Sequence, residues 1–315
     1  MAVAGGEMSA DRCAAPWPRK VLDDAVARAT ITSGQLETMK RAEALRMTRL
    51  VPLAVFVLLA TQASPAAPAS TEVDLELVLA VDVSRSMDAG EQRLQRDGYV
   101  AAFRHPEVIR AIQSGAIGRI AVTYFEWAGP GAQTLIAPWT LIANADDADA
   151  FAAQLSDQAI GGETGTSISS GLYYAVGRLN ASGLTSYRQT IDVSGDGPNN
   201  TGYPVDVTRD WVISRGITIN GLPIVLRPSY ADGPLGIPNL DAYYRDCVIG
   251  GPGAFMIAVT DTVNFETAIR RKLVTEISGL PARVEMAADI LAAEPKTDCL
   301  VGEKARPRMF FNFGR

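Results

Sequence analysis

Residues 75–88 constrain the fold of this chain more than any other stretch; they read Leu-Glu-Leu-Val-Leu-Ala-Val-Asp-Val-Ser-Arg-Ser-Met-Asp. Apolar residues occupy every second position from 75 to 81, and Val78 and Ala80 make the opposite face apolar as well. A strand with two apolar faces is typical of the centre of a parallel sheet that helices cover on both sides. We therefore expect an α/β fold in a single domain, with a doubly wound, mostly parallel central sheet flanked by helices.

The rest of the chain continues this alternation. Apolar runs predict further strands at 120–125, at 133–142 as a hairpin partner on the sheet edge, from 190 to the turn at 195–200, at 217–222 and at 254–259. Helical spacing predicts helices that open near Ala89 and after Thr166 and that cover 205–215 and 265–277, with Asn264 as a cap of the last. Residues 227–253 form a long loop that either borders the functional site or wraps the sheet.

Hard oxygen donors follow the first predicted strand at two-residue spacing. Asp82, Ser84 and Ser86 stand where open α/β sheets bind their ligands, just past the carboxyl end of a strand. Carboxylate and hydroxyl oxygens are ligands that suit a small hard cation such as Mg²⁺. The alternative is a cluster that caps the helix opening near Ala89. Two further donors come from elsewhere: Thr166 at the mouth of a predicted helix, and Asp196 at the end of another strand.

Asp82-x-Ser84-x-Ser86, Thr166 and Asp196-Gly, in this order, resemble the metal-ion-dependent adhesion site of von Willebrand factor A domains. More narrowly, the chain resembles an uncharacterised family of exported bacterial A-domain proteins, over roughly residues 73–280. That likeness rests on Glu-Trp at 126–127, Trp-Thr at 139–140, Asp-Gly-Pro-Asn-Asn at 196–200 and Cys-Val-Ile-Gly-Gly-Pro-Gly-Ala-Phe at 247–255. The narrower family brings no known substrate.

The resemblance implies a binding module rather than an enzyme. Ser84, Ser86 and Thr166 would bind Mg²⁺ or Mn²⁺ through their hydroxyls, and Asp82 and Asp196 would hold it directly or through water. A carboxylate from an unknown protein partner would complete the coordination. Two further acids, Glu126 at a strand end and Asp88 after the serines, are candidates for outer contacts with the site. Glu126 has an alternative role as a hydrogen-bonded residue that fixes the neighbouring loop.

Two other classes of function stay open. A metal-dependent hydrolase of the haloacid-dehalogenase type needs Asp-x-Asp, but Ser84 stands at the second position. Hydrolases that use a Ser-His-Asp triad or zinc need histidine, and His105 is the only one in the chain. The last alternative is a structural domain whose metal site is unused.

Charge and the N-terminal region bear on location. The net charge of −6 and the absence of a basic cluster argue against binding of nucleic acid. A basic stretch followed by the short apolar run 50–60 predicts a signal peptide at 47–63 and no permanent membrane span. We expect residues 1–46 to be an over-extended start or a leader, 64–72 a linker, 73–290 the A-type domain and 291–315 a tail that packs on it. The mature protein would then be periplasmic or secreted.

Two cysteines fall in the part expected to be exported. Cys247 and Cys299 are a natural disulfide in an oxidising compartment, whereas in the cytosol they would more often be free thiols. With export predicted, we expect the disulfide.

Overall fold

The computed structural model describes residues 70–162, 164–226, 237–279 and 297–305. The predicted leader, the signal peptide and the apolar end of the tail lie outside these residues. The predicted linker at 64–72 overlaps ordered structure, because Thr71–Val73 form a short strand, β1, that pairs in parallel with β5 (Leu184–Ser186). The linker therefore extends no further than Ser70.

The central sheet has five strands, and its order is that of a doubly wound fold. The strands are β2 (Glu76–Asp82), β3 (Ile120–Trp127), β4 (Gln133–Ile142), β6 (Gln189–Gly195) and β7 (Thr218–Pro223). They run β4-β3-β2-β6-β7 across the sheet, and β4 alone is antiparallel to its neighbour. The chain thus winds outward from β2 in both directions, and the order reverses between β2 and β6, the position at which such folds bind ligands.

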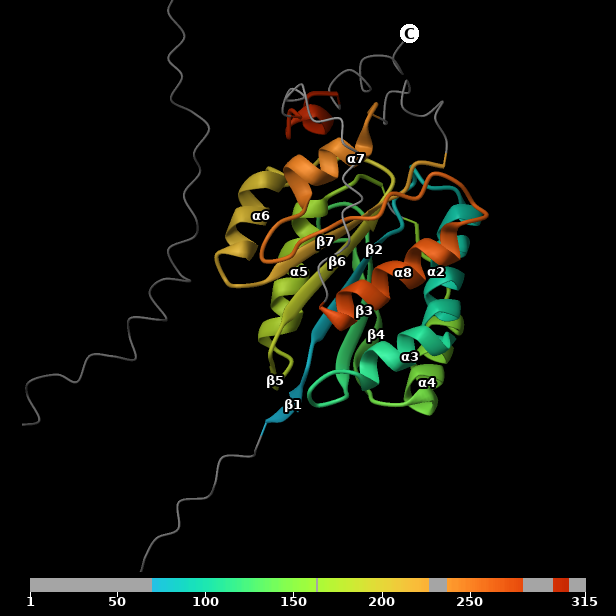
Figure 1. Cartoon of the computed structure of the whole chain (residues 1–315). Helices are drawn as coiled ribbons and strands as arrows, with labels where there is room; N and C mark the ends of the chain where they lie inside the picture. The colour runs from blue at the N-terminus through green and yellow to red at the C-terminus, as the bar shows by residue number, and fades with distance from the viewer. Residues whose placement is uncertain (1–69, 163, 227–236, 280–296, 306–315) are drawn as a thin grey trace, which may run out of the picture. The chain divides into compact units, whose positions relative to one another are not determined.

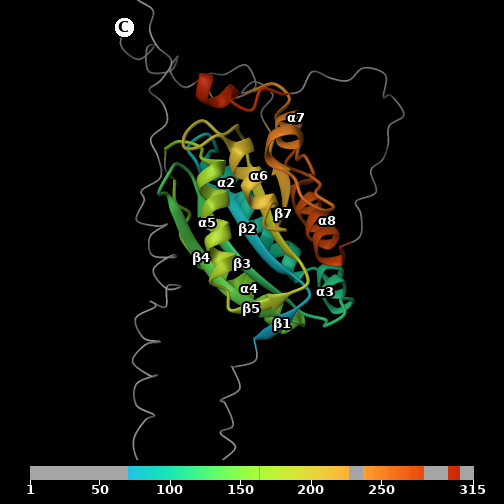
Figure 2. The same cartoon turned by 90° about the vertical axis from the view of Figure 1, so that its left-hand side faces the viewer.

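Helices cover both faces of this sheet (Figures 1 and 2). Alternate residues of β2, including Leu77 and Leu79, pack with α2 (Ala89–Arg104), α3 (Pro106–Gln113), α4 (Ala145–Ser156) and α8 (Phe265–Ser278). Val78 and Ala80 pack on the other side with α5 (Ile168–Asn180) and α6 (Val205–Ile213). Both faces of β2 are therefore buried, as its sequence predicts.

One predicted strand is wrong. Residues 254–259 run beside β7 but touch it only through isolated bridges, Gly221 with Met256 and Ile224 with Val259. Backbone hydrogen bonds do join the two segments, among them Ile257 N to Gly221 O at 3.1 Å. The segment lies where a sixth strand would lie, but it lacks the regular hydrogen-bond ladder of a strand.

The long loop is partly helical. Its described end contains α7 (Leu240–Tyr243) and a π-helix, η2 (Tyr244–Val248), which bury both tyrosines. Asn264 stands at the N-cap position of α8 as expected, but its side chain makes no capping hydrogen bond, and its amide instead donates to Asp261 Oδ2 at 3.0 Å. Among the described residues, no helix combines the length and apolar composition that a membrane span requires.

A charged cluster lies inside the core between β6 and α8. Lys272 Nζ lies 2.5 Å from Asp192 Oδ1 and also pairs with Glu276, and all three side chains are buried. Asn220 Nδ2 donates to Glu276 Oε1 at 2.9 Å. Two carboxylates thus share one ammonium group, which leaves the cluster with one excess negative charge when both are ionised.

Candidate metal centre

The two predicted aspartates meet because their strands are parallel neighbours. β2 ends at Asp82 and β6 at Gly195, and Val81 pairs in register with Ser194. Asp82 and Asp196 therefore leave the same edge of the sheet on adjacent strands. This is the edge at which the strand order reverses, so the fold alone places two carboxylates at its ligand-binding position.

A chain of hydrogen bonds joins all five predicted donors. Asp82 Oδ1 accepts from the backbone N–H of Ser84 at 2.7 Å, and the hydroxyls of Ser84 and Ser86 lie 2.8 Å apart. Ser86 Oγ donates to Asp196 Oδ1 at 2.6 Å, and Thr166 Oγ1 lies 3.5 Å from Ser84 Oγ. Side chains from three separate loops thus converge on one point.

Burial makes the ionised form of the Asp82 carboxyl group in this cluster unfavourable. Asp82 is fully buried, and its Oδ2 has no hydrogen-bond partner among the described residues. Burial, followed by the charge of Asp196, raises the pKa of Asp82 well above its usual value. A cation bound between the two carboxylates would offset both effects. The donor set of two carboxylates and three hydroxyls fits a hard divalent cation.

The hydroxyls are essential to that fit. Within the described ranges, no group of three or more His, Cys, Asp or Glu side chains is placed to hold a metal ion. A centre built here therefore depends on Ser84, Ser86 and Thr166 as much as on the two aspartates.

Helix α2 contacts the backbone of residues 82–84 through two glutamine side chains. Gln95 Nε2 donates to the carbonyl of Asp82 at 3.1 Å, and Gln92 Nε2 donates to those of Val83 and Ser84 at 3.0 and 3.3 Å. Both glutamines are buried. They donate to carbonyl groups at the end of the strand and just past it, which fixes the backbone that carries Ser84.

Thr166 is held by Asn200, which was not among the predicted site residues. Asn200 Oδ1 accepts from Thr166 N at 3.0 Å, and Asn200 N donates to Thr166 O at 2.9 Å. The preceding Gly165 has a φ of +88°, a conformation that favours glycine. The only signal in the sequence is the asparagine pair that follows Asp-Gly-Pro, which is also what a plain turn looks like.

The two outer candidates make other contacts. Glu126 is buried and forms an ion pair with Arg96, whose guanidinium also donates to the carbonyls of Gln158 and Ala159. This is the loop-fixing role that was its alternative. Asp88 caps α2, since its Oδ1 accepts from the backbone N–H groups of Gly90 and Glu91 at 2.8 and 2.9 Å.

The long loop borders the candidate centre. A Cβ atom on Gly195 would lie 2.9 Å from both Asp82 Oδ2 and the hydroxyl of Tyr244. Tyr244 therefore approaches the site across a residue that has no side chain. Burial, and then the charges of Asp82 and Asp196, raise the pKa of Tyr244 well above its usual value, so its hydroxyl stays protonated.

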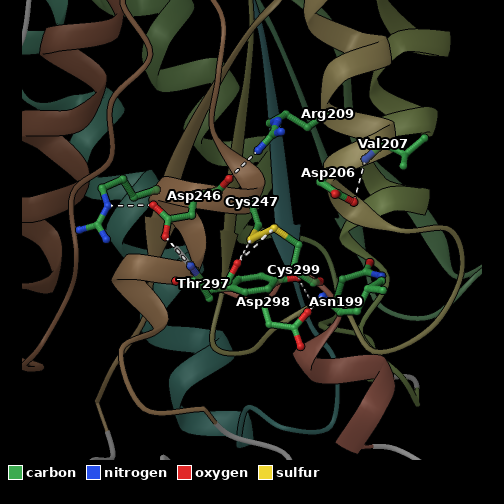
Figure 3. The surroundings of a disulfide bond; sticks show 12 residues. Asn199, Asp206, Val207, Arg209, Asp246, Cys247, Thr297, Asp298 and Cys299 are labelled. Carbon is green, nitrogen blue, oxygen red and sulfur yellow. Dashed lines mark hydrogen bonds and ion pairs between the residues drawn. A yellow bond between two sulfur atoms is a disulfide. The ribbon is translucent and has the colours of Figure 1, made fainter. Parts of the chain in front are cut away.

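Cys247 and Cys299 form a disulfide, with their Cα atoms 5.4 Å apart (Figure 3). The bond joins η2 to the segment 297–305. The disulfide expected from the sequence is confirmed, and it ties the end of the described chain to the loop that borders the candidate centre.

Comparison with known proteins gives one family and several distant structures. A family model described as "Protein of unknown function (DUF1194)" matches residues 72–281. A search of curated proteins found no match.

Three solved structures illustrate the likeness in fold. The proximal thread matrix protein 1 from the mussel byssus, solved with a zinc-occupied MIDAS motif, is 11% identical with a TM-score of 0.46; the match covers 66% of this chain and 49% of that one. A von Willebrand factor type A protein from Catenulispora acidiphila is 16% identical with a TM-score of 0.44, over 65% and 43% of the two chains. An aerotolerance-related membrane protein from Bacteroides fragilis is 18% identical with a TM-score of 0.43, over 65% and 100%.

The chain thus spans about half of the length of the mussel protein. With TM-scores below 0.5, these structures carry no functional argument. The family model stands apart from them, because its match begins within β1 and takes in the whole central sheet and α8. Since it matches well over half of the sequence, the protein belongs to the DUF1194 family.

Proposed function

We propose that this protein is a binding module that depends on a divalent cation, with Mg²⁺ or Mn²⁺ held by Asp82, Ser84, Ser86, Thr166 and Asp196. A carboxylate of a partner protein would complete the coordination. The observation that carries the proposal is the fully buried Asp82, whose Oδ2 has no hydrogen-bond partner in the described chain. Hydrogen bonds link its loop, through Ser84 and Ser86, to oxygen donors of two further loops.

The chain's own residues set up this chemistry. The serine and threonine hydroxyls offer lone pairs to a cation and leave their protons for the carboxylates, as Ser86 already donates to Asp196. Hydroxyl ligands add no negative charge, so among the five donors only Asp82 and Asp196 offset the charge of the ion. When bound, the cation would supply an open position for an incoming carboxylate. The neighbouring backbone, fixed by Gln92, Gln95 and Asn200, keeps the donors in place.

Calorimetric titration of the purified domain with Mg²⁺ and with Mn²⁺ tests the metal site. We expect saturable binding that disappears in the double variant Asp82→Ala, Asp196→Ala and persists in Asp97→Ala, which removes an exposed acid of α2. Bound metal should also raise the melting temperature of the wild type, because ligands that bind only the folded state stabilise it. If neither ion binds at millimolar concentration, or if the double variant binds as the wild type does, the proposal is wrong.

The binding role is tested separately from the metal. A partner captured from host extract in Mg²⁺ should be lost both on chelation and in the double variant. If the metal-loaded protein instead hydrolyses a simple phosphate ester, and the double variant does not, the hydrolase alternative is favoured.

The proposal includes export to the periplasm or the cell exterior. The Cys247–Cys299 disulfide supports it, because structural disulfides persist mainly in oxidising compartments. The predicted signal peptide at 47–63 is the second support.

A further inference from the structure

The segment 297–305 lies beyond the residues that the family model matches, yet it packs beside the loop behind the candidate metal centre (Figures 1 and 3). Cys299 bonds covalently to Cys247 of η2, and Thr297 N donates to Asp246 Oδ2 at 2.9 Å. These two contacts anchor the start of the segment. Its next turn reaches the loop that follows Asp196.

That turn contributes Glu303 to the polar contacts that hold Asn199, and residues outside the segment contribute the others. Glu303 Oε1 accepts from Asn199 Nδ2 at 2.6 Å, and Tyr203 O accepts from the same amide at 3.0 Å. The backbone N–H of Asn199 donates to the Tyr243 hydroxyl at 3.1 Å, and that hydroxyl lies 3.5 Å from Cys299 O. Asn199 is itself fully buried, so each of these polar groups needs its partner.

Close approach of the two backbones depends on Gly302. A Cβ atom at this position would lie 2.1 Å from the carbonyl oxygen of Asn199. No other residue fits there without movement of the backbone. The segment is therefore shaped to seat against Asn199, in addition to being tethered near it.

Asn199 and Asn200 pass this support to the candidate centre. Asn199 Oδ1 accepts from Ser169 N, in the first turn of α5, at 3.1 Å. Asn200 brackets Thr166 by accepting from its N–H and donating to its carbonyl. A continuous path thus runs from Glu303 through the asparagine pair to the threonine that would bind metal.

We propose that the segment 297–305, anchored by the Cys247–Cys299 disulfide, positions Thr166 for metal binding through Asn199 and Asn200. Glu303 and Gly302 are positioning residues: neither reaches the metal, and both fix the loop that does. The inference rests on the proposed function for its consequence in metal affinity. Its structural part, the fixing of Thr166, stands without metal.

The first test compares two substitutions of Glu303 by calorimetric titration with Mg²⁺. Glu303→Ala removes the acceptor and should weaken Mg²⁺ binding about tenfold or more, the usual effect of losing a residue that orients a ligand. Glu303→Gln keeps an acceptor oxygen and should stay within about threefold of the wild type by the same reasoning. Lys304→Ala is the matched control, because Lys304 pairs with Asp298 on the exposed side of the same turn.

The second test needs no metal. In the presence of chelator, Glu303→Ala and the pair Cys247→Ser, Cys299→Ser should both speed amide hydrogen exchange in residues 164–169, while exchange in α2 stays unchanged. Should the cysteine pair fail to fold, the Glu303 variants alone decide the question.

The two tests separate the two proposals. If the wild type binds no Mg²⁺ but the exchange result holds, the metal proposal fails and the positioning of Thr166 stands. The positioning role is overturned if exchange at 164–169 is the same in Glu303→Ala as in Lys304→Ala. It is also overturned if the wild type binds Mg²⁺ and both Glu303 variants bind it with the same affinity.

Discussion

Glu276 is a carboxyl group whose position makes folding stability depend on pH. Burial, and then the charge of Asp192, raise the pKa of Glu276 from 4.5 to about 7. The folded state thus binds this proton more tightly than the unfolded state does, so the contribution of Glu276 to stability is full below about pH 4.5 and is lost as pH rises through about 7. The pairing with Lys272 opposes the shift but is shared with Asp192.

We expect Glu276→Gln to remove roughly 2–3 kcal/mol of the loss of unfolding free energy between pH 5 and 7, because one titrating group changes this free energy by at most about 1.36 kcal/mol per pH unit. The variant should be more stable than the wild type at pH 8, because it removes the excess negative charge of the cluster. Urea unfolding at several pH values, in chelator, measures this. Glu266→Gln, at an exposed position of the same helix, is the control. Equal slopes in the wild type and Glu276→Gln would contradict the prediction.

Residue types, their spacing and the family resemblance predict the donors of the candidate centre but not the residues that support them. Asp82 and Asp196 are predictable because parallel strands end at one edge, and that follows from apolar patterning. Asn200 is not, because an asparagine that holds a backbone looks the same in sequence as one in a solvated turn. The pairing of Glu126 with Arg96, 30 residues apart, depends on how α2 lies across the sheet, which no local pattern encodes.

At the start of helix α2, the role of Asp88 as a helix cap can be distinguished from a role as a contact of the candidate metal centre. Asp88 accepts from two N–H groups of the first turn, and Glu91 Oε2 accepts from Asp88 N at 3.0 Å. We expect Asp88→Ala to lower the unfolding free energy by about 1 kcal/mol, the typical value for loss of such a cap. Asp88→Asn should keep most of it. Mg²⁺ affinity should change little in either variant; a loss in both, measured by titration, would instead assign Asp88 to the metal centre.

Elements with one strong pattern are predicted well, and those set by tertiary contacts are not. The strands at 120–125 and 133–142 appear at their expected places as β3 and the antiparallel edge strand β4. The segment 254–259 has the same apolar composition but lies outside β7, where regular pairing is not enforced from both sides. Helix α7 and η2 escape prediction because Gly, Pro and Tyr around them are typical of loops, while the burial of η2 comes from packing on α6 and β7.

At the scale of the whole molecule, the proposals depend on where the mature chain begins. We expect mass spectrometry of protein from its native host to find an N-terminus near Ser64, because the apolar run 50–60 is followed by the small residues of a cleavage site. A protein that carries Met1 in the soluble cytosolic fraction would contradict both the export and the compartment that supports the disulfide.

The irregular segment beside β7 has a consequence for how molecules of this protein meet. An exposed sheet edge offers unpaired N–H and C=O groups to strands of other chains, and edge-to-edge addition is a common route to aggregation. Here Gly221 and Val225 already use outward-facing backbone groups on residues 255–259. At the opposite edge, β4 contains Pro138, which has no N–H to donate. Residues 255–259 at one edge and Pro138 at the other therefore reduce the number of backbone groups to which a strand of another molecule could pair.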